Sequence, residues 1–72
     1  NPRNALFHFE LGEALRNLGQ LNEAMERYEE ALSLNADLIE CIYALGGIYW
    51  EKQYYDKMVT LYKKAIALYP TN

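Results

Sequence analysis

The stretch FELG at residues 9–12 returns as YALG at residues 43–46, a displacement of 34 positions. The same displacement aligns the rest of the chain with itself, with conservative matches between the identities. A fixed period of this length is typical of proteins that stack one small structural unit. The identical pairs are Leu11 with Leu45, Gly12 with Gly46, Tyr28 with Tyr62, Ala31 with Ala65, and Leu34 with Leu68.

Hydrophobic residues follow a helical period on both sides of each Leu-Gly pair. The spacing predicts helices over residues 3–18 and 23–34 in the first unit, and over about 38–52 and 57–69 in the second. No segment alternates in the manner of a half-buried strand. The sequence therefore predicts four helices and no sheet.

Residues that favour helix ends lie between these segments. Glycine after a helix supports its C-terminal cap, Asn and Asp can cap an N-terminus, and proline cannot continue a helix. An acidic residue followed three positions later by Glu resembles a capping box. The predicted caps and stops are Gly19, Asn22, Asp37 with Glu40, Asp56 and Pro70.

The expected fold is all-α, with two antiparallel helix-turn-helix hairpins stacked as a fragment of an α-solenoid. We expect residues 5–38 to form the first unit and residues 39–72 the second, within a single repeat fragment over 1–72. Pro2 and Pro70 occupy the same phase of the repeat. The chain is therefore expected to be a segment of a longer array.

These residues also allow a comparison with a known family. Its 34-residue signature has the form W-x2-L-G-x2-Y, then A-x3-F, then P. The chain resembles the tetratricopeptide repeat family over its whole length. The first unit carries His8, Leu11, Gly12, Leu15, Ala24, Tyr28, Ala31 and Ala36 at the signature positions, and the second carries Ile42, Leu45, Gly46, Tyr49, Met58, Tyr62, Ala65 and Pro70.

The chain departs from the signature at several positions. Neither unit has tryptophan at the first position of the signature, and smaller or larger residues replace others. These changes alter local packing but leave the predicted fold unchanged. The departures are His8 and Ile42 for Trp, Leu15 for Tyr, Met58 for Ala, Ala36 for Pro, and Gln53 at the position of Gly19.

The recurring small residues have a physical reason. Glycine within a helix costs about 1 kcal/mol relative to alanine, so close packing must offset that cost. We expect the glycines and alanines to allow the helices of a hairpin to approach, and the tyrosines to fill space between hairpins. The residues concerned are Gly12 and Gly46, Ala31 and Ala65, and Tyr28 and Tyr62.

Composition excludes several classes of protein. With 51% hydrophobic and 24% charged residues, the chain is not disordered. Its net charge of −3 opposes general binding to nucleic acid. The single cysteine allows neither an internal disulfide nor a thiolate zinc site. No apolar run approaches the roughly 20 residues that span a bilayer. Acidic residues are concentrated in the first unit.

No catalytic constellation is present. His8 occupies a packing position of the repeat and is interpreted as a spacer, and Cys41 as a small core thiol. Acid pairs such as Glu10 with Glu13 are typical of a solvated helix face. Gly46-Gly47 lies inside a predicted helix and lacks the strand context of a phosphate loop. The sequence predicts neither enzymatic activity nor a cofactor or metal.

The resemblance implies a binding surface, because the first helix of each hairpin in this family lines a concave groove for a partner segment. The aligned positions combine an apolar floor with an acidic rim, which favours a protein or peptide of basic and apolar character. Gly47 is not required by the fold and could admit a close backbone approach. An alternative is that the aromatic residues pack against neighbouring repeats. The groove residues are Phe9, Glu10, Glu13, Glu40, Tyr43, Gly47, Trp50 and Glu51.

A second surface follows from the number of repeats. Each repeat contacts only its neighbours, and about three are usually needed for a continuous core. The fourth predicted helix therefore presents an apolar edge through which we expect the chain to form a dimer or oligomer, end to end or by exchanging hairpins. An assembly element with no separate ligand is the alternative function. The edge residues are Val59, Tyr62, Ile66 and Tyr69.

Overall fold

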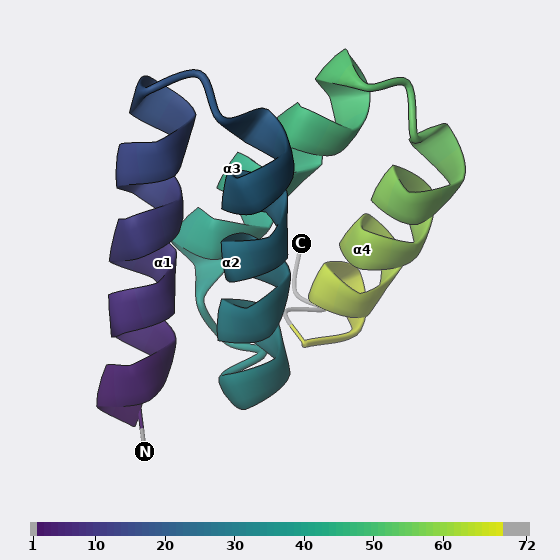
Figure 1. Ribbon diagram of the computed structural model, residues 1–72. Coiled ribbons are helices and arrows are strands. Elements are labelled where there is room, and N and C mark those ends of the chain that lie inside the picture. Colours follow the sequence, from purple (N-terminus) through teal and green to yellow (C-terminus); the bar gives the residue numbers. More distant parts are fainter. Residues whose placement is uncertain (1, 69–72) are drawn as a thin grey trace.

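A computed structural model describes residues 2–68 and contains four helices in this span, with no strand (Figure 1). They are α1 (Pro2–Asn17), α2 (Leu21–Leu34), α3 (Ile39–Glu51) and α4 (Tyr55–Leu68). The all-α prediction is confirmed. The predicted stop at Pro70 and the edge residue Tyr69 lie outside the described residues.

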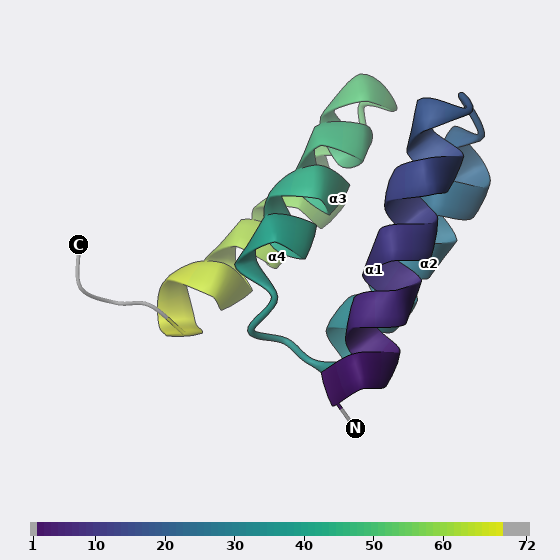
Figure 2. The ribbon, with the colours of Figure 1, turned by 90° about the vertical axis from the view of Figure 1, so that its left-hand side faces the viewer.

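The helices form two hairpins in chain order. α1 packs against α2, α2 against α3, and α3 against α4, so α1 and α4 lie at opposite ends of the stack. Figure 2 shows the second hairpin inclined to the first. This is the predicted arrangement of a helical solenoid fragment.

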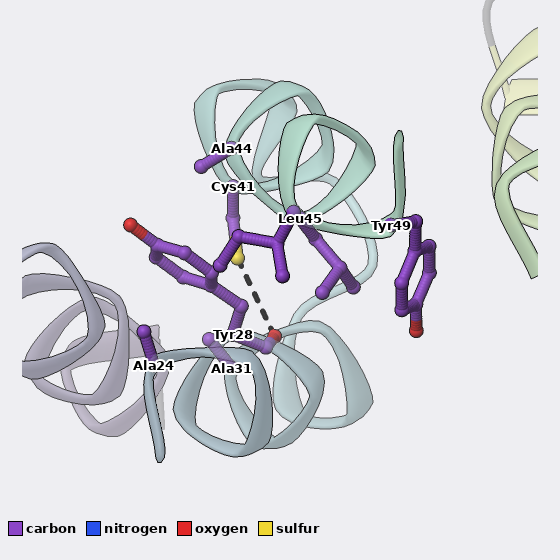
Figure 3. Close-up of a cluster of buried hydrophobic side chains, with 8 residues drawn as sticks. Ala24, Tyr28, Ala31, Cys41, Ala44, Leu45 and Tyr49 are labelled. Carbon is purple, nitrogen blue, oxygen red and sulfur yellow. Dashed lines mark hydrogen bonds between the residues drawn. The ribbon is translucent and has the colours of Figure 1, made fainter. Parts of the chain in front are cut away.

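The core lies where α2 meets α3 (Figure 3). Its α2 side consists of two alanines around one large ring, and its α3 side contributes more residues, among them the large Leu45, Ile48 and Tyr49. α4 has no fully buried residue, so the outer face of the second hairpin is uncovered within residues 2–68. The buried cluster contains Ala24, Tyr28, Ala31, Cys41, Ala44, Leu45, Ile48 and Tyr49.

The two Leu-Gly glycines each face a tyrosine of the opposite helix. A Cβ at Gly12 would lie 2.8 Å from Cδ1 and Cε1 of Tyr28, and one at Gly46 would collide with the Tyr62 hydroxyl. The predicted close approach is therefore confirmed. The tyrosines fill space within their hairpins, and Tyr28 alone also fills the space between hairpins, where α3 covers it.

The second hairpin packs less closely than the first. Ala24, fully buried on α2, is replaced by the larger Met58 at the matching position of α4. At Gly46 the tip of the tyrosine ring, rather than its edge, meets the glycine. The contact between α3 and α4 therefore differs from that between α1 and α2 at both of these positions.

The turn inside each hairpin has the same hydrogen-bond pattern. After α1, the Gly19 N–H donates to the Arg16 carbonyl and Gln20 to Leu15, both at 2.9 Å. After α3, the corresponding N–H groups of residues 53 and 54 donate to Trp50 at 3.0 Å and Tyr49 at 2.8 Å. This is a Schellman motif, which places one residue in the left-handed region. That residue is Gly19 at φ 83° in the first turn and Gln53 at φ 63° in the second.

The predicted N-terminal caps are wrong. The Schellman turn leads directly into the next helix, so α2 begins at Leu21 after Gln20, and no side chain caps it. Asn22 lies within the first turn of α2, and Asp56 within that of α4. Leu38 precedes α3 without a side-chain cap, and the Asp37 N–H instead donates to Oδ1 of Asn35 at 3.0 Å. In the first turn, Asp56 and Glu40 complement the helix dipole instead.

Replacing Gln53 by glycine should stabilise the chain by about 1 kcal/mol, because a side chain is strained at a left-handed φ. Denaturant unfolding followed by circular dichroism measures the change. The matched control is Gly19→Gln, which introduces the same strain in the first turn and should destabilise by a similar amount. A Gln53→Gly variant with unchanged or lower stability would contradict the prediction.

Candidate functional site

Two adjoining hollows lie between α1 and α3, and together they form the surface called the groove below. Both hollows are open, and Arg16 lines both of them. The first is lined by Phe9, Glu13, Arg16, Glu40, Tyr43 and Ala44, and the second by Arg16, Gly19, Leu21, Gly47, Ile48 and Glu51.

The groove contains most of the residues expected from the sequence. Phe9, Glu13, Glu40 and Tyr43 share the first hollow, while Gly47 and Glu51 line the second. The remaining two lie elsewhere. Glu10 is exposed on α1 and lines neither hollow. Trp50 packs against Tyr55 of α4, with ring centroids 5.4 Å apart, and also lines neither.

The aromatic floor has one anchored ring and one free ring. Phe9 is half-buried, and its ring centroid lies 5.8 Å from that of the buried Tyr28. Tyr43 is 68% exposed, and its ring has no aromatic partner among the described residues. Tyr43 is therefore the aromatic surface that the first hollow offers to a partner.

Glu13 connects the groove to the core. Its Oε2 accepts a 2.8 Å hydrogen bond from the Tyr28 hydroxyl, and its Oε1 lies 3.6 Å from Nη2 of Arg16. Burial, reinforced by this hydrogen bond, raises the pKa of Tyr28 well above its ordinary value. The sequence placed Glu13 on the rim and did not reveal this bond, because the tyrosine lies on another helix.

The remaining groove acids are available to a partner. Glu40 and Glu51 are exposed, and their carboxylates form no hydrogen bond or ion pair within the part of the chain that the structure describes. Arg16 is the one basic residue that lines the groove there, and it lies beside Glu13. The unpaired charge of the groove is therefore negative.

A similar tyrosine–glutamate pair joins α2 to α3 away from the groove. The Tyr49 hydroxyl donates to Oε2 of Glu29 at 2.6 Å. Burial and this hydrogen bond raise the pKa of Tyr49 above its ordinary value. Each hydroxyl can donate its hydrogen bond only while the tyrosine is neutral.

The two residues weighed as chemical groups have structural roles. Nη1 of Arg27 donates to Nδ1 of the half-buried His8 at 3.3 Å, which ties α2 to α1. Cys41 is fully buried, and its thiol donates to the Tyr28 carbonyl at 3.4 Å. Burial raises the pKa of Cys41 to about 12, so its reactive thiolate is disfavoured at neutral pH. Residues 2–68 contain no cluster of metal-ligating side chains.

The predicted edge on α4 is largely uncovered. Val59 is 48% and Ile66 66% exposed. Tyr62 is half-buried, because its hydroxyl end rests against Gly46. Two apolar residues of the edge are therefore open to a partner, while the tyrosine ring also serves the hairpin.

Comparison with known proteins agrees with the repeat. A family model described as TPR repeat matches residues 12–53, and one described as tetratricopeptide repeat matches residues 39–72. The chain belongs to the tetratricopeptide repeat family. Repeats of this family are scaffolds for protein–protein interaction, and protein binding is therefore the general role of the chain.

One curated relative is described as a probable UDP-N-acetylglucosamine–peptide N-acetylglucosaminyltransferase SPINDLY, from Oryza sativa subsp. japonica. It is 34% identical over 56 residues, which cover 78% of this chain but 6% of the relative. Because the similarity lies within the repeats, it supports the scaffold and carries no catalytic residue to this chain. No solved structure gives a significant match. None of the helices described over residues 2–68 is long and apolar enough to cross a bilayer.

The free energy of unfolding should fall as the pH rises above about 10, the ordinary pKa of tyrosine. Tyr28 and Tyr49 have raised pKa values in the folded state, so above pH 10 the unfolded chain loses protons that the folded chain retains. Their stabilising contribution is complete below pH 10 and is lost toward the folded pKa. With both tyrosines, the slope approaches about 2.7 kcal/mol per pH unit.

Urea unfolding at a series of alkaline pH values measures this slope. Tyr28→Phe and Tyr49→Phe should each reduce it, whereas Tyr43→Phe, which changes an exposed hydroxyl, is the matched control and should not. A stability that does not change between pH 9 and pH 11.5 would show that the two hydroxyls do not titrate as described.

Proposed function

We propose that the chain is a protein-interaction module that holds an extended or helical segment of a partner protein in the groove between α1 and α3. The observation that supports this proposal is the open surface of Tyr43 beside two unpaired carboxylates, Glu40 and Glu51. An exposed aromatic ring supplies apolar contact area at low entropic cost, and it is a common anchor of interfaces.

The charge of the groove favours a basic and apolar partner segment. Glu40 and Glu51 lie at its two ends, and Arg16 is neutralised locally by Glu13. A lysine or arginine side chain that reached either carboxylate would gain charge complementarity, and an apolar residue between them could contact Tyr43. An acidic segment would meet like charge at both ends.

A second candidate function is assembly without a separate ligand. It is favoured by a specific observation, the uncovered apolar edge of α4 at Val59 and Ile66. The two functions are separable because the groove lies on α1 and α3, whereas this edge lies on α4.

A synthetic peptide that alternates lysine with leucine should bind the chain more tightly than its glutamate–leucine counterpart. Tyr43→Ala should weaken binding by about 2 kcal/mol, or roughly thirtyfold, because an aromatic anchor is lost. Glu40→Lys should weaken it severalfold, and the effect should diminish as salt screens the charge. Fluorescence anisotropy with a labelled peptide measures all three.

The matched control for charge is Glu26→Lys, which reverses an exposed acid on α2, a helix that contributes only Leu21 to the groove. It should change affinity less than Glu40→Lys. Equal effects of the two reversals would show that the peptide responds to net charge and not to the groove. Tighter binding of the acidic peptide would contradict the proposal directly.

Replacing Gly47 by alanine should have opposite effects on stability and binding. A Cβ at Gly47 would meet no atom within 4 Å, and alanine favours the helix, so the free energy of unfolding should rise by about 1 kcal/mol. If the partner backbone approaches α3 at this glycine, the added methyl group should weaken the lysine–leucine peptide. Urea unfolding and peptide titration of one preparation test both parts, and unchanged affinity would remove Gly47 from the groove.

A further inference from the structure

The outer faces of α4 and α1 correspond, one repeat apart, to the two faces that pack together where α2 meets α3. On α2, that junction buries Ala24, Tyr28 and Ala31 completely. The repeat places Met58, Tyr62 and Ala65 at the corresponding positions of α4, where each is only partly buried. The outer face of α4 is thus built like the covered face of α2, but no helix covers it within residues 2–68.

The opposite end supplies that missing helix. Cys41, Leu45 and Ile48 form the face of α3 that covers α2, and they are at most 2% exposed. Their counterparts on α1, one repeat earlier, are Phe7, Leu11 and Ala14. Phe7 is 62% and Leu11 46% exposed, and Leu18, one turn further along the same face, is 71% exposed. α1 therefore presents an uncovered apolar stripe that resembles the covering face of α3.

Charge distinguishes a second copy from other partners of this face. Within the chain, one hollow beside the α2–α3 junction is lined by Glu29 of α2 and by Lys57 and Lys64 of α4. The position one repeat after Glu29 holds Lys63. The positions one repeat before Lys57 and Lys64 hold Glu23 and Glu30. The other charged residue of this hollow, Asp56, corresponds to the neutral Asn22 one repeat earlier. The remaining three charges are reversed together, so one acid beside two bases is replaced by one base beside two acids.

We propose that copies of this chain stack head to tail, with α1 of one copy on α4 of the next and Lys63 facing Glu23 and Glu30 of the adjoining copy. This inference rests on the second candidate function, assembly, and it specifies the surface, the register and the partner. Because the two contacting surfaces differ, the interface is heterologous and can be repeated at each end.

The same stacking extends the groove. Phe9 and Arg16 of α1 line the hollow that faces α3, and their counterparts one repeat later are Tyr43 and Trp50. In the stacked copies, these two residues face α1 of the adjoining copy. Trp50, which lines neither hollow of the groove in the single chain, then becomes a groove residue at the junction between copies.

Sedimentation velocity of the 72-residue chain from micromolar to millimolar concentration tests the proposal. The expected result is a species distribution that grows beyond the dimer as concentration rises, because each added copy leaves both faces open. Association should weaken as salt rises. A strictly monomeric chain would overturn both the register and the assembly function. Association that stops at a dimer would overturn head-to-tail stacking and leave assembly standing.

Charge reversal tests the register itself. Lys63→Glu should raise the dissociation constant about tenfold, and Glu23→Lys with Glu30→Lys should do the same, because each places like charges across the junction. The triple variant that combines all three changes should associate as the wild type does. An equimolar mixture of the Lys63→Glu variant with the Glu23→Lys, Glu30→Lys variant should also recover association. Because only folded chains can stack, this recovery would show that neither variant is unfolded.

The matched control combines Lys63→Glu with Glu40→Lys and Glu51→Lys. It has the same net charge as the triple variant but leaves Glu23 and Glu30 in place. It should remain as weakly associated as Lys63→Glu alone. If the control recovers association as fully as the triple variant, net charge and not the proposed register governs assembly, and the proposal is wrong. Circular dichroism of each variant verifies the helical fold.

Discussion

The Tyr28 ring is the contact on which three of the four helices depend. It enters from α2, lies against the bare backbone of Gly12 on α1, and is covered from the other side by α3. Its hydroxyl donates to Glu13, and its carbonyl accepts the Cys41 thiol, so none of its polar atoms is buried without a partner. A single residue thus sets the distance between α1 and α2 and forms part of the surface on which α3 packs. Any side chain larger than hydrogen at Gly12 would have to displace this ring.

The same constraint explains why the two hairpins differ. Tyr62 repeats Tyr28, and Gly46 repeats Gly12, but α4 has no further helix against its outer side within the described residues. Met58 in place of Ala24 adds bulk where the first hairpin has almost none. Without a covering helix, the second tyrosine meets its glycine with the hydroxyl end, and α4 remains partly exposed. The repeat in sequence is therefore more regular than the repeat in packing.

The core around Tyr28 fixes the position of two groove residues. Phe9 rests on Tyr28, and Glu13 is held by the Tyr28 hydroxyl, so the floor of the first hollow is fixed by a residue that does not line it. Tyr43, Glu40 and Glu51 have no such restraint and remain available to a partner. A rigid floor with a free aromatic ring and free charges suits a binding surface, because ordering costs are small where the scaffold is already fixed. The outer faces of α1 and α4 also carry exposed apolar side chains, Phe7 and Leu11 on the first and Val59 and Ile66 on the second.

The sequence by itself determined the repeat, the four helices, the glycine–tyrosine positions and most of the groove. These follow from period and residue type, which are local or recur at a fixed distance along the chain. It did not determine the helix starts, because the Schellman turns at Gly19 and Gln53 lead into the next helix without the expected side-chain caps. A left-handed glutamine cannot be recognised from residue type alone.

Only the tertiary structure decided what each polar and aromatic side chain contacts. The bonds from Tyr28 to Glu13 and from Tyr49 to Glu29 join different helices, so their geometry depends on how the hairpins pack. Trp50 occupies a groove position in the repeat, yet in the single chain its ring packs against Tyr55 of α4 and lines neither hollow of the groove. Sequence spacing places a residue on a helix face. The neighbouring helix determines whether that face lines the groove, stays exposed as an outer face, or packs between two hairpins.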